Sequence, residues 1–205
     1  MEYLIYHPED FEYNRILYGY LKPEQKNEKL LLPNSRYNLI KDTYILKNVG
    51  AMCEESYVDN IDNYRSRIRY ELATYKNTTG KAHKYANDWE SVAKTIYKEL
   101  EFGNELKKEN YYEEDITKLL IGKDYSEDEK IYLVLNFVKN KVKWDNTYGI
   151  LCDKGVKEAY KTGNGNVAEI NLMLTSMLRF AKIDANPVIL STKSNGISLF
   201  PSRTA

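Results

Sequence analysis

The chain has 205 residues and a mass of 24.0 kDa, with 30 Lys and Arg against 30 Asp and Glu and 42% hydrophobic residues. Residues 1–86 carry 13 basic and 12 acidic side chains, so both halves are nearly neutral and neither has the long-range positive field that attracts nucleic acid or anionic lipid. The length is that of one large domain or two small ones, and no aliphatic run is long enough to span a bilayer.

Residues 1–86 have the pattern of antiparallel β-strands, in which aromatic and β-branched residues lie between turn formers. The chain holds 19 tyrosines, which are typical of strands exposed on one face and also of peptide or glycan grooves. Ile68, Tyr70 and Leu72 alternate with charged residues, which is the period of a half-buried strand. The clearest runs are residues 13–20, 37–49 and 64–75.

After Tyr85 the apolar period changes to that of helices. Asn87 and Asp88 are suited to cap a first helix, which Gly103 ends. A second, short helix is expected over residues 112–120. Ser126-Glu-Asp-Glu129 is a capping box that opens a third helix toward Val142. The predicted apolar stripes are Trp89, Val92, Ile96 and Leu100 for the first helix, and Ile131, Leu135 and Val138 for the third.

The most informative segment spans residues 161–192. Gly163-Asn-Gly-Asn166 predicts a turn before a strongly apolar helix, and residues 185–192, Ala-Asn-Pro-Val-Ile-Leu-Ser-Thr, predict a strand. We expect this helix to be the most buried in the chain, because apolar residues occur on more than one of its faces. Its predicted stripe is Val167, Ile170, Leu174, Met177, Leu178 and Ala181.

This succession of glycine-rich turn, buried helix and strand resembles the core of the transglutaminase-like superfamily, whose fold is related to papain. In that family a Gly-x-Cys turn puts the nucleophilic cysteine at a helix N-terminus, where the helix dipole lowers the thiol pKa and stabilises an oxyanion. Matching Met177-Leu178-Arg179 to the family pattern puts Gly165 on the glycine and Val167 on the cysteine. A slip of one residue would put Asn166 or Ala168 there, and neither is a nucleophile. The resemblance therefore implies a lost catalytic cysteine.

The resemblance extends upstream through the helix near Trp89 and Val142-Lys-Trp-Asp145 to residues 46–64. This order resembles bacterial proteins that join a transglutaminase-like domain to a preceding β domain of unknown function, and it implies a periplasmic or cell-surface location. The first residues predict no secretory signal. The last residues directly follow the predicted strand, so we expect the chain to be part of a longer protein.

The two cysteines leave alternatives open. Cys53 and Cys152 show no metal-ligand spacing and are either two thiols or one disulfide. Cys152 is a conceivable displaced nucleophile, but no histidine follows it and no helix begins at it. The family's His and Asp lie downstream of its cysteine, whereas His7 and His83 lie upstream of Val167 in this chain. An enzyme reading would therefore need residues after Ala205.

A tryptophan, a glycine pair and the two histidines could each have either a functional or an ordinary structural role. Trp144 either lines a cleft beside Val167 or belongs to the core. Gly163-x-Gly165 lacks the third glycine and the lysine of nucleotide-binding loops. His7 and His83 are expected on the surface, with too few soft ligands for a metal site.

These observations predict an α+β fold with two domains. Residues 1–86 are expected to form an antiparallel β domain, which is the C-terminal part of a larger β domain. Residues 87–205 are expected to form a helical subdomain of a truncated, incomplete transglutaminase-like core. The predicted function is non-catalytic binding of peptide, protein or cell-wall material in a degenerate active-site cleft, with no cofactor and no metal. One alternative is a thiol acyltransferase or peptidase that uses Cys152, and another is a structural or carbohydrate-recognising module. The candidate site residues are Trp144, Cys152, Asn166 and Val167.

Overall fold

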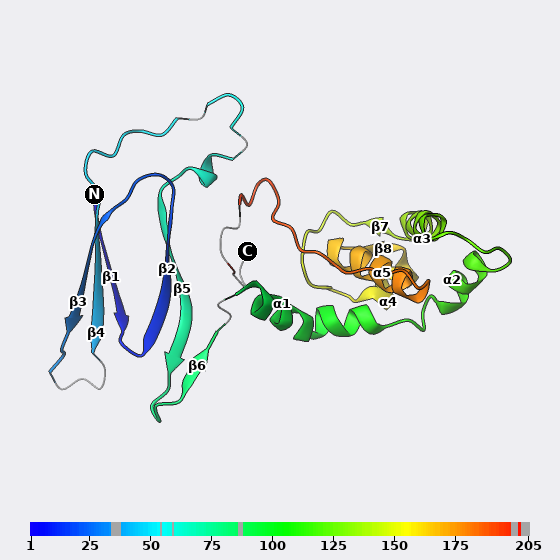
Figure 1. Cartoon of the computed structure of the whole chain (residues 1–205), viewed down its shortest axis with the longest axis horizontal. Coiled ribbons are helices and arrows are strands. Elements are labelled where there is room, and N and C mark those ends of the chain that lie inside the picture. Colours follow the sequence, from blue (N-terminus) through cyan, green and yellow to red (C-terminus); the bar gives the residue numbers. More distant parts are fainter. Residues whose placement is uncertain (34–37, 54, 59, 86–87, 198–200, 202–205) are drawn as a thin grey trace. The chain divides into compact units, whose positions relative to one another are not determined.

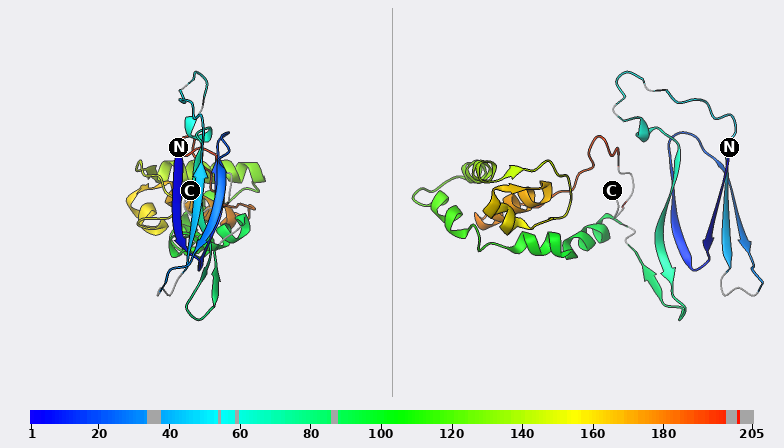
Figure 2. Two further views of the ribbon diagram at one scale, coloured as in Figure 1. Left: turned by 90° about the vertical axis from the view of Figure 1, so that its left-hand side faces the viewer. Right: turned by 180° about the vertical axis from the view of Figure 1, so that it is seen from behind.

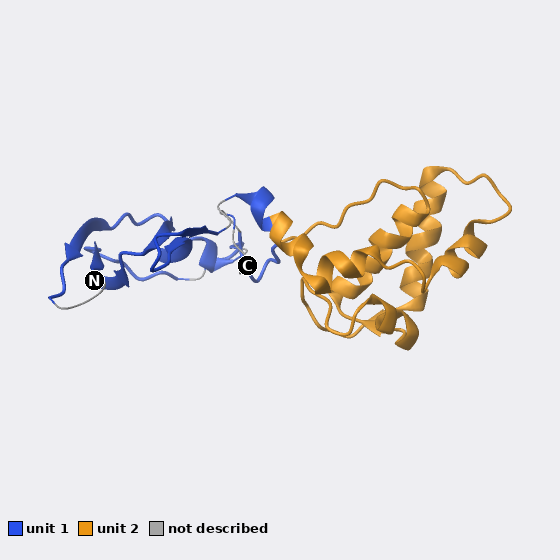
Figure 3. Cartoon of the chain, turned by 90° about the horizontal axis from the view of Figure 1, so that it is seen from below, with its two compact units in different colours: residues 1–92, 191–205 blue, residues 93–190 orange. Residues whose placement is uncertain are grey.

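The computed structural model describes residues 1–33, 38–53, 55–58, 60–85, 88–197 and 201. Strands come first along the chain and helices follow (Figure 1), which confirms the predicted α+β class. The chain divides into two compact units, Met1–Val92 with Ser191–Ala205, and Ala93–Leu190 (Figure 3). The division between the units falls after Val92, and the assignment of domains to residues 1–86 and 87–205 stays a prediction. Within the described residues, no helix is long and apolar enough to cross a membrane.

The first unit contains two antiparallel sheets, which can be followed from two further sides in Figure 2. One sheet has the order β1-β4-β3 and the other has the order β2-β5-β6. A cavity of about 500 Å³ lies within this unit, with an apolar lining that includes Ile5, Leu17 and Tyr44. The elements are β1 (Glu2–Pro8), β2 (Phe11–Tyr18), β3 (Glu24–Leu30), β4 (Leu39–Ile45), a 3-10 turn (Ile61–Asn63), β5 (Arg67–Lys76) and β6 (Ala82–Lys84).

Strand β3 has no apolar alternation, because its sequence is Glu-Gln-Lys-Asn-Glu-Lys-Leu. It pairs along its whole length with β4, from Glu24 opposite Ile45 to Leu30 opposite Leu39. A cross-strand ion pair between Lys41 of β4 and Glu28 of β3, at 3.2 Å, accompanies this pairing. The three runs that the sequence predicts most clearly correspond to β2, β4 and β5.

The two histidines differ in burial. His83 is exposed on β6, as expected, but the prediction that His7 is a surface residue is wrong, since His7 is only 8% exposed. The ring of His7 lies edge-on to Tyr13 of the other sheet, with ring centroids 5.0 Å apart. Burial between two sheets depends on how those sheets pack, which the local sequence of β1 does not encode.

The second unit contains helices and one short parallel strand pair, β7 with β8. Helix α1 (Trp89–Lys98) begins in the first unit and is followed by a π-helical turn (Leu100–Asn104) and a 3-10 turn (Glu105–Lys107). The other elements are α2 (Glu113–Leu120), α3 (Glu127–Lys141), β7 (Lys143–Trp144), α4 (Val156–Thr162), β8 (Asn164–Gly165) and α5 (Val167–Phe180).

Helix α1 begins at the predicted position but ends at Lys98, before the predicted end, and Gly103 lies within the π-helical turn that follows. The carboxylate of Asp88 accepts a hydrogen bond from the Ser91 amide at 2.7 Å, while Asn87 lies outside the described residues. A Cβ atom on Gly103 would lie 1.9 Å from the carbonyl oxygen of Tyr97, so only glycine fits at this turn. The predicted stripe is partly wrong, because Val92 is buried and Ile96 half-buried whereas Trp89 and Leu100 are exposed.

The capping box of α3 is confirmed. The Ser126 hydroxyl accepts a hydrogen bond from the Glu129 amide at 3.3 Å, and the Glu129 carboxylate accepts one from the Ser126 amide at 2.9 Å. Val138 is buried as predicted, but Leu135 is exposed and Val134 takes its place in the core. The capping residues determine where the helix starts, whereas the packing of neighbouring helices determines which face is buried.

Helix α5 has more buried residues than any other described helix, as expected. The predicted stripe is partly wrong. Met177 and Ala181 are buried as expected, whereas Val167, Ile170, Leu174 and Leu178 are only half-buried. The helix is covered on several sides, so polar residues also lie inside. The buried residues of α5 are Ala168, Glu169, Leu172, Met173, Thr175, Ser176 and Met177.

The predicted strand over residues 185–192 is wrong. A left-handed Lys182, with φ of 68°, ends helix α5, and the chain then continues without ladder hydrogen bonds to any described segment. Val188 and Leu190 are exposed, so the apolar pattern that predicts a strand has no partner strand among the described residues. The side chain of Arg179 holds this link, because it donates hydrogen bonds to the Ala185 carbonyl and the Asn186 side chain.

Candidate functional site

The start of helix α5 is held by a buried capping box. Asn166 is the N-cap residue, and its side-chain oxygen accepts a hydrogen bond from the Glu169 amide at 2.8 Å. The Glu169 carboxylate in turn accepts one from the Asn166 amide at 2.9 Å. Asn166 is 1% exposed and Glu169 is 0% exposed. The backbone at the predicted nucleophile position is therefore fixed by polar groups that water does not reach.

Glu169 also fixes the loop that leads into helix α4. Its second carboxylate oxygen accepts hydrogen bonds from the amides of Lys154 at 2.8 Å and Gly155 at 2.9 Å. The side-chain amide of Asn166 donates to the Leu151 carbonyl at 3.0 Å. One buried carboxylate thus holds the loop before α4 against the first turn of α5. Glu169 is not among the residues that the sequence predicts for the site, although Asn-x-x-Glu before an apolar run is a capping signature.

Strands β7 and β8 bring Trp144 to the start of α5. They pair in parallel, with Trp144 opposite Gly165, the residue before the N-cap. The Asp145 amide donates to the Gly165 carbonyl at 3.0 Å, and the Val167 amide donates to the Thr147 carbonyl at 3.2 Å. Trp144 and Val167 are thus held near each other by backbone hydrogen bonds, from positions more than twenty residues apart in the sequence.

Two aromatic side chains are exposed beside this helix start. The Trp144 indole donates a hydrogen bond to the Thr147 carbonyl at 3.0 Å, which is the carbonyl that also receives the Val167 amide. Tyr148 lies edge-on to Trp144, with ring centroids 5.0 Å apart. Trp144 is 42% exposed and Tyr148 is 72% exposed. The two rings present apolar faces to solvent near Val167, and their polar edges can form hydrogen bonds. Such a surface is suited to contact with a peptide or glycan chain.

Asp145 orders the turn that carries the aromatic pair. Its carboxylate accepts a hydrogen bond from the Thr147 amide at 2.9 Å and lies 3.7 Å from the Lys154 ammonium. The hydrogen bond from the Thr147 backbone, followed by the contact with Lys154, holds the pKa of Asp145 below its usual range. Asp145 is therefore ionised at neutral pH and positions the turn.

Cys152 lies near the capping box but in the core. It is 5% exposed, its amide donates to the Glu101 carbonyl at 3.0 Å, and its thiol is free. Burial, with the carboxylates of Glu169 and Glu105 nearby, raises the pKa of Cys152 to about 12. Cys53 is an exposed free thiol, so the two cysteines are not joined.

Neither of the predicted candidates for a nucleophile is activated among the described residues at the start of α5. Val167, the first residue of α5, has no nucleophilic atom, and Cys152 is held as the neutral thiol at physiological pH. Both histidines of the sequence belong to the first unit. Of the predicted site residues, the structure places Trp144, Asn166 and Val167 together, and it places Cys152 in the packed core behind them.

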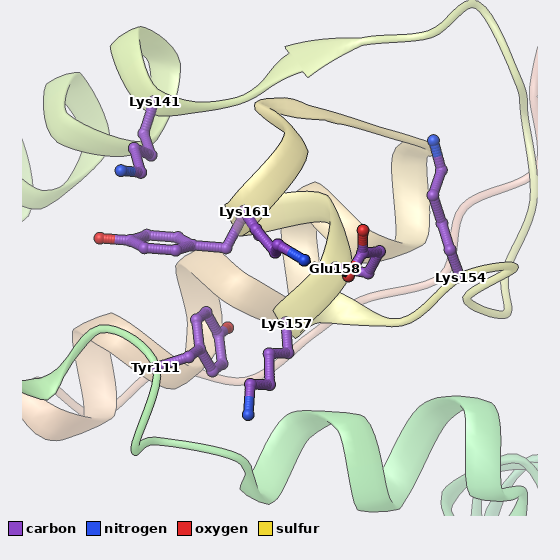
Figure 4. Close-up of a pocket in the computed structure, with 7 residues that line it drawn as sticks. Tyr111, Lys141, Lys154, Lys157, Glu158 and Lys161 are labelled. Carbon is purple, nitrogen blue, oxygen red and sulfur yellow. Dashed lines mark ion pairs between the residues drawn. The ribbon is translucent and has the colours of Figure 1, made fainter.

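A concave region of about 640 Å³ lies around helix α4 in the same unit. Four lysines line it, but the ammonium groups of Lys154 and Lys157 point in opposite directions (Figure 4). Lys161 lies 4.0 Å from Glu158, and Lys141 lies over the ring of Tyr160, 4.4 Å from its centroid. The positive charges are therefore dispersed rather than aimed at one point. Among the described residues, no group of His, Cys, Asp and Glu is arranged to hold a metal ion.

No family model and no curated protein sequence matches the chain. Its structure is similar to a crystal structure described as a "putative protease" from Parabacteroides distasonis ATCC 8503, with a TM-score of 0.51 and 18% sequence identity. The match covers 88% of this chain and 32% of that protein, so the chain spans about a third of that protein's length. At this identity, the likeness shows that the chain shares its fold with part of that protein.

Proposed function

We propose that the chain is a non-catalytic relative of the transglutaminase-like superfamily that binds peptide, protein or cell-wall material at the start of helix α5. The observation that carries the proposal is Val167, which occupies the first position of a buried, capped helix. In the family that the sequence resembles, this position holds the catalytic cysteine. The capping box of Asn166 and Glu169 maintains the helix start that a cleft needs, while the reactive atom is missing.

The exposed pair of Trp144 and Tyr148 supports a binding role. Their rings lie next to Val167 and present apolar surface to solvent. Aromatic side chains with one polar tip bind peptide backbones and sugar rings, because they combine apolar contact with a hydrogen-bonding edge. The similar Parabacteroides protein is described as a "putative protease", a description that supports binding of extended chains at this site.

The alternative of a thiol enzyme that uses Cys152 is less well supported. A thiol with a pKa of about 12 is almost entirely protonated at neutral pH. Cys152 is also packed against the core cluster and does not face solvent. Ammonia release from glutamine peptides that is abolished by Cys152→Ala would reverse this conclusion.

Binding is tested with the full chain carrying Trp89→Phe, so that Trp144 is the sole tryptophan and is excited at wavelengths that the 19 tyrosines do not absorb. Two probes are titrated separately, a pool of random hexapeptides and a disaccharide-tetrapeptide fragment of peptidoglycan. We expect a saturable change in Trp144 fluorescence with one of them. In calorimetry of the otherwise unchanged chain, Trp144→Ala should weaken binding of that probe by at least about tenfold, as expected for an aromatic anchor.

The matched control is Tyr132→Ala, which removes an exposed tyrosine from helix α3. This variant should bind as tightly as the unmodified chain. Absence of saturation with both probes, or equal binding by the Trp144→Ala variant, would refute the proposed site.

A further inference from the structure

The cavity of about 500 Å³ in the first unit lies at one end of its two sheets. At this end, which carries the mark N in Figure 1, β1 and β5 begin and β2 and β4 end. The cross-strand pair of Tyr3 and Tyr44 lines the cavity from one sheet, and the pair of Leu17 and Ile68 lines it from the other. Both sheets therefore contribute to its walls.

Apolar side chains that reach solvent surround this cavity. Leu4 is 48% exposed, Val49 is 43% exposed and Met52 is 39% exposed. Exposed apolar residues that gather in one place mark interaction sites and ligand grooves. The volume of about 500 Å³ lies within the range of about 300–1,000 Å³ that is typical of sites for small molecules. The cavity therefore has the size and the lining of a ligand site.

The charged side chains that line the cavity are both arginines, Arg65 and Arg67. Arg65 is paired with Asp62 at 2.8 Å, so its charge is compensated. The guanidinium of Arg67 lies over the Tyr18 ring, 4.2 Å from its centroid, and no carboxylate among the described residues lies within ion-pair distance of it. Arg67 therefore carries the uncompensated positive charge at the cavity.

Stacking on Tyr18 leaves the hydrogen-bond donors of Arg67 available. The ring contacts the flat face of the guanidinium, whereas the N–H groups of a guanidinium lie in its plane. Those N–H groups form a planar fork that matches a carboxylate through two parallel hydrogen bonds. Charge complementarity therefore favours an anionic head group at Arg67, and a carboxylate above all.

The lining offers few polar groups to a sugar or a nucleotide. The Ser66 hydroxyl already accepts a hydrogen bond from the Leu21 amide at 3.2 Å, and the Tyr44 hydroxyl is bonded to the Tyr70 hydroxyl at 2.7 Å. A ligand with many hydroxyl or amide groups would leave them unpaired against the aliphatic walls, which costs free energy. An aliphatic tail gains free energy from the same burial.

We propose that the cavity binds a free fatty acid, with the carboxylate at Arg67 and the acyl tail against the apolar side chains of both sheets. The tail would contact Leu4 and Ile5 of β1, Leu17 of β2 and Ile68 of β5. The protein has 30 basic and 30 acidic residues, so it has no excess of positive charge to hold it on an anionic membrane. The ligand is therefore a single molecule taken from solution.

Binding is tested by calorimetry of the full chain with decanoate and with decyltrimethylammonium, which has an equal tail and the opposite charge, both below their micelle concentrations. We expect one decanoate to bind per chain, and decyltrimethylammonium to bind at least about tenfold more weakly. Because the tail is buried, affinity should increase by about fourfold for each methylene added between octanoate and decanoate. Equal affinity for the two head groups, or no dependence on tail length, would overturn the proposal.

Two variants test the role of Arg67 in the same assay. Arg67→Gln should weaken decanoate binding by about tenfold, and Arg67→Lys should restore part of this loss because it keeps the charge without the planar fork. The matched control is Lys76→Gln, which removes a positive charge at the other end of β5 and should bind decanoate as the unmodified chain does. Both positions are exposed, so the variants keep the packed sheets. A full preference for decanoate in Arg67→Gln would contradict the assignment of the head group.

Other occupants of the cavity give different results. Binding of the chain to phosphatidylglycerol vesicles without binding of monomeric decanoate would show that a membrane covers the cavity. A dimer in sedimentation velocity that Leu4→Asp dissociates and decanoate does not would show that a second copy covers it. Either result would overturn the proposal. The residues concerned belong to the first unit, so these outcomes are independent of the site proposed at α5.

Discussion

Replacement of Glu169 by glutamine should destabilise the second unit far more than the same change in an exposed capping box. The Glu169 carboxylate accepts three backbone hydrogen bonds, from Asn166, Lys154 and Gly155. Glutamine keeps one oxygen and presents an NH₂ group where the other oxygen stood. In the better orientation of the glutamine side chain, its oxygen accepts the hydrogen bonds from the Lys154 and Gly155 amides. Its NH₂ group then faces the Asn166 amide, so two donors oppose each other.

The loss can be estimated from these contacts. One buried donor left without a partner costs about 1–3 kcal/mol, and the remaining hydrogen bonds lose their charge assistance. We therefore expect Glu169→Gln to lower the free energy of unfolding of the second unit by about 2–4 kcal/mol. Urea unfolding followed by circular dichroism at the helix band measures this change, because the helices of the chain belong almost entirely to that unit.

Helix α3 provides the matched control. Glu129 has the same position in the capping box of Ser126, but it is exposed, so water replaces the lost acceptor in Glu129→Gln. The urea midpoint should then move only slightly. Equal losses in the two variants would refute the reasoning, because they would show that burial of Glu169 adds nothing to the capping role.

Four further outcomes are expected. Val167→Cys, in a background of Cys53→Ser and Cys152→Ser, should give a thiol with a pKa below the free value of about 8.5, because the thiol lies at a helix N-terminus. The rate of iodoacetamide labelling as a function of pH measures this pKa. A pKa at or above that of a free thiol would remove the main support for the family resemblance. Leu172→Ala, at a position 2% exposed, should cost about 2–5 kcal/mol in urea unfolding and Leu178→Ala clearly less, so a larger loss at the half-buried Leu178 would contradict the described core. A thiol reagent should label Cys53 alone in the native chain and both cysteines in guanidinium, since burial raises the pKa of Cys152 to about 12; rapid labelling of both would contradict this burial. Burial raises the pKa of Asp42, but hydrogen bonds from Tyr70 and Asn27 and the charge of Arg15 lower it further. Asp42 thus has a folded pKa below its usual value, so its stabilising effect should be complete above about pH 4 and decrease as the pH falls further. In the unmodified chain, the hydrogen-exchange protection of the β4 amides should therefore decrease below that pH, and Asp42→Asn should reduce this decrease. An unchanged decrease in Asp42→Asn would exclude Asp42 as its cause.

Local patterns in the sequence predict the elements whose signals are themselves local. The aromatic and β-branched runs of β2, β4 and β5 are visible, and the Ser126 capping box marks the start of α3 to the residue. Strand β3 is not visible, because pairing with β4 and not apolar alternation keeps it extended. Residues 185–192 are the opposite case. Their apolar and β-branched sequence predicts a strand, but no strand among the described residues pairs with them.

The candidate site shows the same limit. Val167 and Asn166 follow from matching one segment to a known motif, and Trp144 follows from its place in Val142-Lys-Trp-Asp145. The burial of Cys152 and the triple bonding of Glu169 depend on how the loop before α4 folds back on α5. No spacing within either segment encodes that contact. Chemistry that rests on one helix terminus can be predicted from the sequence, and chemistry that rests on the meeting of distant loops cannot.

The extended link after helix α5 has a consequence for how the protein behaves in concentrated solution. Val188, Ile189 and Leu190 are exposed apolar residues in succession, on a stretch that makes no ladder hydrogen bonds within the described residues. An apolar, unpaired stretch of backbone invites pairing with other chains. Light scattering should therefore increase with protein concentration, and the charge introduced by Ile189→Lys should suppress that increase while leaving the buried helix α5 intact.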